Sequence, residues 1–451
     1  MSSCSNARNQ ATDFFSDESR WQSWLDVEAA LALTQSEIGM IPVETGKHIA
    51  ARAHLKYLNL DEMRREIKKT MAPVHTLSEC LAKACGDSGS YVHFGATTQN
   101  IVETGRLLVL KRVQSCIFVG LADLLSLLSY QAEKFSDTIM VGRTNGQNAL
   151  PITYGFKIAG WIDELIRVAD QLVETEPRLF QLRFGGAIGG YHSFGADGYK
   201  LAENLSKRLR LALSIVPNRT SVDPLIEYIT RLSALGLAIN RISSEFYLLM
   251  SENISEVSEV QSNQVVGSST MPQKINPKYI VSLIDSGWQL RSKAGLAFST
   301  ISPSHEGEQL VNRHLSNLLE ETCKIAIEVL GQAVSVFSRI KPNIERMREN
   351  FETSREALAT ERLMLFLAKK IGRSHAHHLV HQVSQQAISQ GKPLQKLILD
   401  TPEIVGSLSV NLINDILLKE EYAGQCNAIS KQLAALGLTR ARKLRNLSNN
   451  R

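Results

Sequence analysis

The 451-residue sequence lacks any uncharged apolar run of the roughly 18 residues that cross a bilayer. Its most apolar stretch, Cys116 to Tyr130, is interrupted by Asp123. The N-terminus also lacks the apolar segment of a secretory signal. These absences predict a cytoplasmic protein without a membrane partner.

Cysteine is scarce, and no two of the six cysteines form a C-x-x-C pair. No cluster of cysteine and histidine has the spacing of zinc ligands, so we expect no metal site. Scattered, reduced thiols fit the cytosol.

Positive charge is in excess only near the C-terminus. The net charge is +5, but six basic residues and no acidic one follow from Lys431 onward. The remainder has 44 basic against 45 acidic residues, so it carries no net positive charge that would attract a polyanion. No nucleic-acid partner is therefore expected. Favourable charge at a helix C-terminus explains the tail.

Proline is absent from long tracts, including the one between Pro73 and Pro151. Proline breaks helix interiors, so such tracts permit long helices. Apolar residues recur at helical spacing in 228–259, and 106–135, 154–174 and 312–340 behave alike. Strand signals are scarce and no repeated hairpin is evident. The sequence therefore predicts an all-α fold built on a bundle of long helices.

Three helical regions are expected, with the middle one dominant. A polar patch at 85–95 separates the N-terminal region, and the last long helix ends near Pro342. We assign residues 1–105 to an N-terminal region and residues 351–451 to a C-terminal one. The central bundle takes residues 106–350 and includes a loop at 262–278.

Two polar segments lack the apolar periodicity of a core helix. Residues 91–100 combine His93 with the hydroxyls of Thr97 and Thr98, which suits a site but also suits a turn that caps the next helix. Residues 142–151 are polar and contain two glycines. Arg143 there could hold a carboxylate through its two-pronged donor set, although an ordinary helix–helix loop explains the segment as well.

The third segment, Gly267–Pro277, places three hydroxyls after a glycine and follows them with Lys274 and Asn276. Such a loop can bend, carry a base and supply positive charge beside it. A serine-rich surface linker is the alternative, but it fits poorly with the Met-Pro and Lys-x-Asn-Pro sequences in the same loop.

These three segments, in this order, resemble the fumarase/aspartase superfamily of lyases. The third matches its G-S-S-x-M-P-x-K-x-N-P signature at every fixed position. The resemblance runs from about residue 15 to 440 and includes Arg20-Trp21 and the glycine-rich turn at 185–190. Within the superfamily, the chain is similar to the branch of adenylosuccinate lyases and 3-carboxy-cis,cis-muconate cycloisomerases. The cycloisomerases are favoured within this branch by two segments, Met71-Ala72-Pro73-Val74 and His305-Glu306.

The resemblance implies β-elimination from a succinyl-type substrate with release of fumarate or a related unsaturated dicarboxylate. Ser268 matches the family's base, and Lys274 matches a group that binds the carboxylate or the dianion formed from it. His93 matches a histidine near the site, and Asn145 stands where a catalytic histidine is usual. The residues that match substrate-binding positions are Arg20, Thr97, Thr98, Gln147, Ser269, Met271 and Asn276.

Three departures from the family pattern bear on the substrate. Asn145 cannot deliver a proton, Asn100 stands where aspartate is usual, and Gly307 stands where arginine is usual. Either the leaving group needs no acid, or His75 or His93 supplies the proton in place of the histidine that is usual at position 145. A non-catalytic relative that acts as a binding or structural homo-oligomer is the alternative.

The resemblance also implies a homotetramer whose active sites take segments from three subunits. Central helices that are apolar on more than one face agree with burial in such a shared bundle. The expected partners are a small-molecule dicarboxylate and further copies of the chain. The family's chemistry needs no cofactor, and we expect none.

Overall fold

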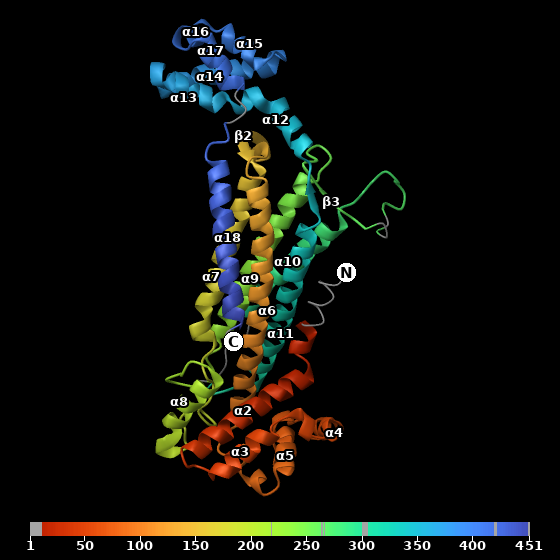
Figure 1. Ribbon diagram of the computed structural model, residues 1–451, viewed down its shortest axis with the longest axis vertical. Helices are drawn as coiled ribbons and strands as arrows, with labels where there is room; N and C mark the ends of the chain where they lie inside the picture. Colours follow the sequence, from red (N-terminus) through yellow and green to blue (C-terminus); the bar gives the residue numbers. More distant parts are fainter. Residues whose placement is uncertain are drawn as a thin grey trace.

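The computed structural model describes residues 11–217, 219–262, 265, 267–299, 305–418 and 422–449. Long helices form a bundle that lies between two smaller groups of helices (Figure 1). The all-α prediction is confirmed. The helices of the bundle are α6 (Thr98–Lys134), α7 (Tyr154–Leu179), α9 (Asp223–Leu249), α10 (Lys278–Phe298), α11 (Gln309–Phe337) and α18 (Cys426–Asn449).

The helix α6 runs the length of the bundle because nothing in its sequence interrupts it. Thr97 and Asn100 form a capping box at its start, and no proline occurs along its 37 residues. At 1.5 Å per residue it spans about 55 Å. It has the length and hydropathy of a membrane span, but 56% of its most apolar window is buried inside the fold. We therefore interpret it as the core helix of the bundle.

The N-terminal helices cover one end of the bundle and have their own apolar core around Trp24, Leu77 and Ile101. Ile101 belongs to α6, so this helix contributes to the N-terminal core before it enters the bundle. The elements are α2 (Asp17–Glu37), α3 (Val43–Arg52), η1 (Leu55–Tyr57), α4 (Leu60–Thr70), α5 (Pro73–Cys85) and η2 (Gly86–Tyr91), with η3 (Gly195–Asp197) and α8 (Gly198–Leu209) beside them.

The other end of the bundle carries a group of shorter helices with a separate core around Leu363, Leu367 and Ile413. Gly372 and Gly391 lie in the turns between them, and Pro402 begins α16, the position in a helix where proline is tolerated. The elements are α12 (Ile344–Leu358), α13 (Thr360–Ile371), α14 (Arg373–Gln390), α15 (Leu394–Leu399), α16 (Pro402–Ser407) and α17 (Val410–Leu418).

Two short antiparallel sheets correct the sequence interpretation. The strands β1 (Ile139–Thr144) and β2 (Gln147–Thr153) form a hairpin where a helix–helix loop was one expectation. The strand β3 (Val257–Glu259) pairs with β4 (Ile340–Pro342). The helical pattern expected over 228–259 therefore ends at Leu249, because the residues after it turn and join this sheet.

The basic C-terminal residues pack against the bundle. Arg440 of α18 pairs with Asp170 of α7, and the Arg445 Nη2 atom lies 2.8 Å from Asp123 Oδ1 of α6. These ion pairs account for part of the local excess of positive charge without any external partner.

Candidate functional site

The turn between η2 and α6 holds His93 against a buried carboxylate. The His93 Nδ1 atom lies 2.6 Å from Oε1 of Glu28, which comes from the middle of α2 and is 1% exposed. Burial disfavours the charged imidazole, but the hydrogen bond and charge of Glu28 outweigh it and raise the pKa of His93 above its ordinary value. With Nδ1 facing Glu28, Nε2 is the atom available to give or take a proton.

Thr97 and Thr98 begin α6, as the capping interpretation of this segment predicted. The Asn100 Oδ1 atom accepts the Thr97 backbone N–H at 3.2 Å, and Asn100 Nδ2 donates to the Arg183 backbone oxygen at 3.4 Å. Asn100 is 2% exposed, and an aspartate there could not donate the second bond. The departure at Asn100 therefore has a structural reason. Thr98 itself is exposed.

Asn145 lies at the tip of the β1–β2 hairpin, with Gly146 as the second residue of a two-residue turn. The φ angles of these two residues are +52° and +73°, as a type I′ turn requires. Asparagine tolerates this conformation better than most residues, which gives Asn145 a local role besides any chemistry. Both Asn145 and Gln147 are exposed.

The hairpin is fixed to the body by Arg143. Its Nη1 and Nη2 atoms lie 2.9 and 2.8 Å from the two carboxylate oxygens of Glu256, a residue with 0% exposure just before β3. Asn350 adds a hydrogen bond to Glu256 at 2.9 Å. The two-pronged carboxylate contact expected of Arg143 therefore exists, but its partner belongs to this chain and not to a substrate.

The signature loop, with its expected range 262–278, joins β3 to α10, and residues 263, 264 and 266 of it lie outside the described residues. Ser268 is half-buried, and its Oγ accepts the Met271 backbone N–H at 3.1 Å. Such a donor would also stabilise an alkoxide on Ser268. Ser269, Met271 and Lys274 are exposed, whereas Asn276 is half-buried.

Glu259 anchors the end of this loop. Its carboxylate accepts the backbone N–H groups of Tyr279 and Ile280, at 3.1 and 2.7 Å, and so caps α10. It also accepts a bond from Gln261, which in turn donates to the Asn276 backbone oxygen. The base of the loop is therefore held in place, while its signature residues remain accessible.

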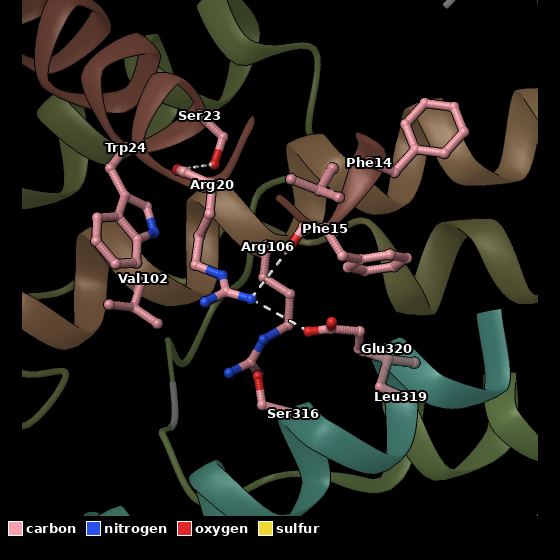
Figure 2. Close-up of a pocket in the computed structure, with 11 residues that line it drawn as sticks. Phe14, Phe15, Arg20, Ser23, Trp24, Val102, Arg106, Ser316, Leu319 and Glu320 are labelled. Carbon is pink, nitrogen blue, oxygen red and sulfur yellow. Dashed lines mark hydrogen bonds and ion pairs between the residues drawn. The ribbon is translucent and has the colours of Figure 1, made fainter. Parts of the chain in front are cut away.

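Arg20 is engaged within the protomer. Its Nη2 atom lies 3.1 Å from Glu320 Oε2, and Asp17 and the Phe15 backbone oxygen are further partners. The pair of Arg20 and Glu320 lies on the wall of a cavity of about 60 Å³, beside Arg106 and Trp24 (Figure 2).

The three segments do not meet within one chain. Thr97 and Thr98 lie at the start of α6, whereas the hairpin with Asn145 follows its last turn, about 55 Å away along the helix axis. The signature loop projects sideways from the bundle, away from the N-terminal helices (Figure 1). A site that uses all three segments therefore needs more than one copy of the chain.

Sequence reasoning missed the acidic partners of the named residues, which are Glu28, Glu256 and Glu259. One signal was present for Glu28, because this acid lies one turn from Trp24, Leu25, Leu31 and Ala32 on a helix. Glu256 and Glu259 gave no such signal. The partner of Glu256, Arg143, is 113 residues away, and Glu259 bonds mainly to backbone N–H groups, which no side-chain pattern reveals. Within the described ranges, no three His, Cys, Asp or Glu side chains are arranged to hold a metal ion.

A family model described as "Lyase" matches residues 3–285, and one described as "Adenylosuccinate lyase C-terminus" matches residues 356–433. Among curated proteins, the chain is 30% identical to N-acetyl-S-(2-succino)cysteine lyase of Dickeya dadantii, over 91% of this chain and 90% of that protein. It is 31% identical to adenylosuccinate lyase of Methanothermobacter thermautotrophicus, over 92% of this chain and 94% of that protein.

Among solved structures, the chain is similar to the crystal structure of 3-carboxy-cis,cis-muconate lactonizing enzyme from Pseudomonas putida. The TM-score is 0.83 with 29% sequence identity, and the similarity covers 97% of each chain. The relatives thus act on different substrates within one family.

Proposed function

We propose that this chain, which belongs to the fumarase/aspartase superfamily of lyases, catalyses β-elimination from a succinyl-type substrate and releases fumarate or a related unsaturated dicarboxylate. The observation that carries the proposal is the complete signature loop, in which Ser268 accepts a backbone N–H and Lys274 is accessible.

The chemical difficulty is the acidity of a proton beside a carboxylate. Ser268 removes this proton as an alkoxide, and Lys274 with Asn276 holds the doubly charged species that results. Fixed donors and charge aimed at that species supply the largest share of the rate enhancement in such reactions. The loop closes over the substrate and excludes water.

His93 supplies the proton that the leaving group requires, in place of the histidine missing at Asn145. Its Nδ1 is fixed by Glu28, and its raised pKa keeps it protonated at a higher pH than a free imidazole. A positioned acid contributes about 10²–10⁴-fold to such a step. Thr97, Thr98, Gln147 and Arg20 bind or surround the carboxylates.

The leaving group of the substrate is an amine, as in adenylosuccinate, or a thiol, as in a 2-succino thioether. A cycloisomerase reaction on a carboxymuconate is the second candidate, favoured by the structural similarity to the lactonizing enzyme and by Ala72-Pro73.

The assembly is a cytoplasmic homotetramer with sites shared between subunits. The separation of the three segments along α6 supports this, and so does apolar surface left open on the bundle. Leu237 and Leu248 of α9, Val281, Trp288 and Phe298 of α10, and Leu310 of α11 are each about half or more exposed. Packing of these helices against further copies would cover them.

Fumarate release tests the reaction. The panel is adenylosuccinate, N-acetyl-S-(2-succino)cysteine, aspartate and nitrosuccinate, with lactone formation followed for carboxymuconate. We expect turnover of one compound that Ser268→Ala abolishes and that Ser258→Ala, an exposed serine on β3, preserves. Undiminished turnover by Ser268→Ala refutes the assignment of the base. Binding without turnover across the panel favours the non-catalytic alternative.

Mixing two inactive variants tests the shared site. Thr98→Ala and Ser268→Ala alter different segments, so a hybrid oligomer contains some sites with both native segments. We expect part of the activity to return after the two variants are co-refolded. A monomeric mass in solution, or no recovery from hybrids of confirmed composition, contradicts the model.

A further inference from the structure

Arg106 of α6 is a partly buried arginine that carries no direct ion pair or hydrogen bond in the described part of the chain. Burial is the main cause that lowers the pKa of Arg106. The opposite charge that acts on Arg106 is Glu103, and Arg183 and Arg219 act on the same carboxylate. Removing a cation from water is costly when its counter-charge is shared in this way, so a fold rarely retains one without a use.

Arg106 lies between two cavities. One is the cavity of Figure 2, where its guanidinium points toward Ser316 of α11. The other is a smaller cavity of about 20 Å³, which Arg183, Arg219, Glu103 and Asn312 also line. Glu103 is the only acid among these lining residues, and it faces three guanidinium groups. The smaller cavity therefore carries an excess of positive charge.

Arg219 reaches this cavity from the segment before α9. Its Nη1 donates to the Ala187 backbone oxygen, and its Nε is buried without a partner. Its guanidinium also fills the space beside Gly307: a Cβ atom at Gly307 would lie 3.2 Å from Arg219 Cζ. The chain therefore has a guanidinium next to the position where the family resemblance leads one to expect an arginine side chain.

We propose that Arg106 and Arg219 bind a carboxylate on the leaving group of the substrate, so that the enzyme selects succinyl compounds whose departing part is itself an acid. This inference rests on the proposed function. Two planar guanidiniums suit a carboxylate because each offers paired donors in a fixed geometry.

Distance assigns this carboxylate to the leaving group. Arg106 follows Thr98 by eight residues, which is about 12 Å along the helix axis. The two carboxylates of a succinyl unit are separated by only two carbon atoms. If Thr97 and Thr98 surround the succinyl part, Arg106 lies beyond its reach and faces the substituent.

Size favours a carboxylate over a phosphate. A single water needs roughly 10–15 Å³ of free space, so a cavity of about 20 Å³ admits a group one or two waters in size. The two oxygens of a carboxylate fit such a space, whereas the four oxygens of a phosphate monoester exceed it. A nucleotide leaving group is therefore disfavoured at this site.

The test uses two 2-succino thioethers that differ only in the leaving group, N-acetylcysteine in one and its carboxamide in the other. Binding is measured by calorimetry on the full-length Ser268→Ala protein, so that turnover does not interfere. Loss of a hydrogen-bonded charge contact corresponds to about 1.5–3 kcal/mol, or roughly 10- to 150-fold in Kd. We expect the acid to bind tighter than the amide by a factor in this range.

Arg106→Met and Arg219→Met should each reduce this preference about tenfold or more, with Arg106→Lys retaining part of it. Arg112→Met is the matched control, because Arg112 lies on the same helix and bonds Ser19 outside the cavity. Circular dichroism and oligomer mass establish that each variant folds. Equal Kd values for acid and amide in the parent protein overturn the proposal, and so does an unchanged preference in both folded methionine variants.

Inorganic phosphate serves as the competing anion. Competition by millimolar phosphate without any preference for the acid thioether means a phosphate site and overturns the carboxylate assignment. Fumarate release is measured separately with Ser268 intact. If the acid thioether binds more tightly than the amide but no fumarate is released, the carboxylate site is supported and the lyase proposal is refuted. If turnover depends on Ser268 but is the same for the acid and the amide, the lyase proposal is supported and the carboxylate site is refuted.

Discussion

The contact between His93 and Glu28 makes the pH dependence of the reaction predictable. In Glu28→Gln the side chain keeps its shape and loses its charge. The 2.6 Å contact joins a carboxylate with 1% exposure to an imidazole whose side chain is 24% exposed, so solvent screens it little. A hydrogen bond to a charged group contributes about 1.5–3 kcal/mol, and 1.4 kcal/mol is a factor of ten.

The protonated form of His93 is therefore disfavoured by roughly 10- to 150-fold in the variant. If His93 is the acid, kcat/KM of Glu28→Gln falls by a similar factor above neutral pH, where the native imidazole is still protonated. Toward low pH the two profiles approach each other, because both imidazoles carry the proton there.

The assay is a kcat/KM profile from pH 5.5 to 9 on whichever substrate of the panel is turned over. Glu37→Gln is the control, since Glu37 lies on the same helix and pairs with Arg208 at the surface. An alkaline limb at the same pH in Glu28→Gln and the native protein would refute the assignment of His93 as the acid.

The same contact predicts the pH dependence of stability. The pKa of His93 is higher in the folded chain than its ordinary value of 6.5. The stabilisation from this group is therefore complete below about pH 6.5 and is lost as pH rises through the folded-state pKa. Chemical denaturation should show the largest gap between the native protein and Glu28→Gln near pH 6 and a smaller gap at pH 9. A gap that grows with pH would contradict this sign.

Three further predictions concern the segments around the site. Arg143→Met leaves the Glu256 carboxylate buried and unpaired, so we expect a loss of about 3–5 kcal/mol in urea denaturation; a loss under 1 kcal/mol would mean that water reaches Glu256. Asn145→Ala should cost about 1–2 kcal/mol because its φ angle is positive, while Asn145→Gly should cost less; equal stabilities would show that the turn rearranges. Glu259→Ala removes the cap of α10, so we expect a loss of about 1–2 kcal/mol together with a rise in KM; unchanged kinetics would separate the cap from the loop geometry.

The sequence predicted the helical elements well where apolar periodicity and the absence of proline agreed. The core helices expected at 106–135, 154–174 and 312–340 all form, with ends up to eight residues from those expected. It failed for the β1–β2 hairpin, although Asn145-Gly146 is the residue pair that favours a type I′ turn. The alternation of residues around this pair was too short to outweigh the helical interpretation of the flanking tracts.

The candidate site was likewise predictable from the sequence only in part. The residue types and spacing of Gly267–Pro277 were sufficient to identify the family, because a signature loop is local in sequence. The roles of Ser268, Lys274 and the other matched residues stay predictions until they are tested by substitution.

The sequence alone determined the all-α class, the family and the residues of the three polar segments, because each depends on neighbours along the chain. Only the tertiary structure decided what these residues contact. It paired His93 with Glu28 and Arg143 with Glu256, it left Arg106 to share the charge of Glu103 with Arg183 and Arg219, and it put the length of α6 between two segments of the expected site. Such contacts join residues that are tens to hundreds of positions apart in the chain. They are determined by side-chain packing in the folded protein, which local propensity does not encode.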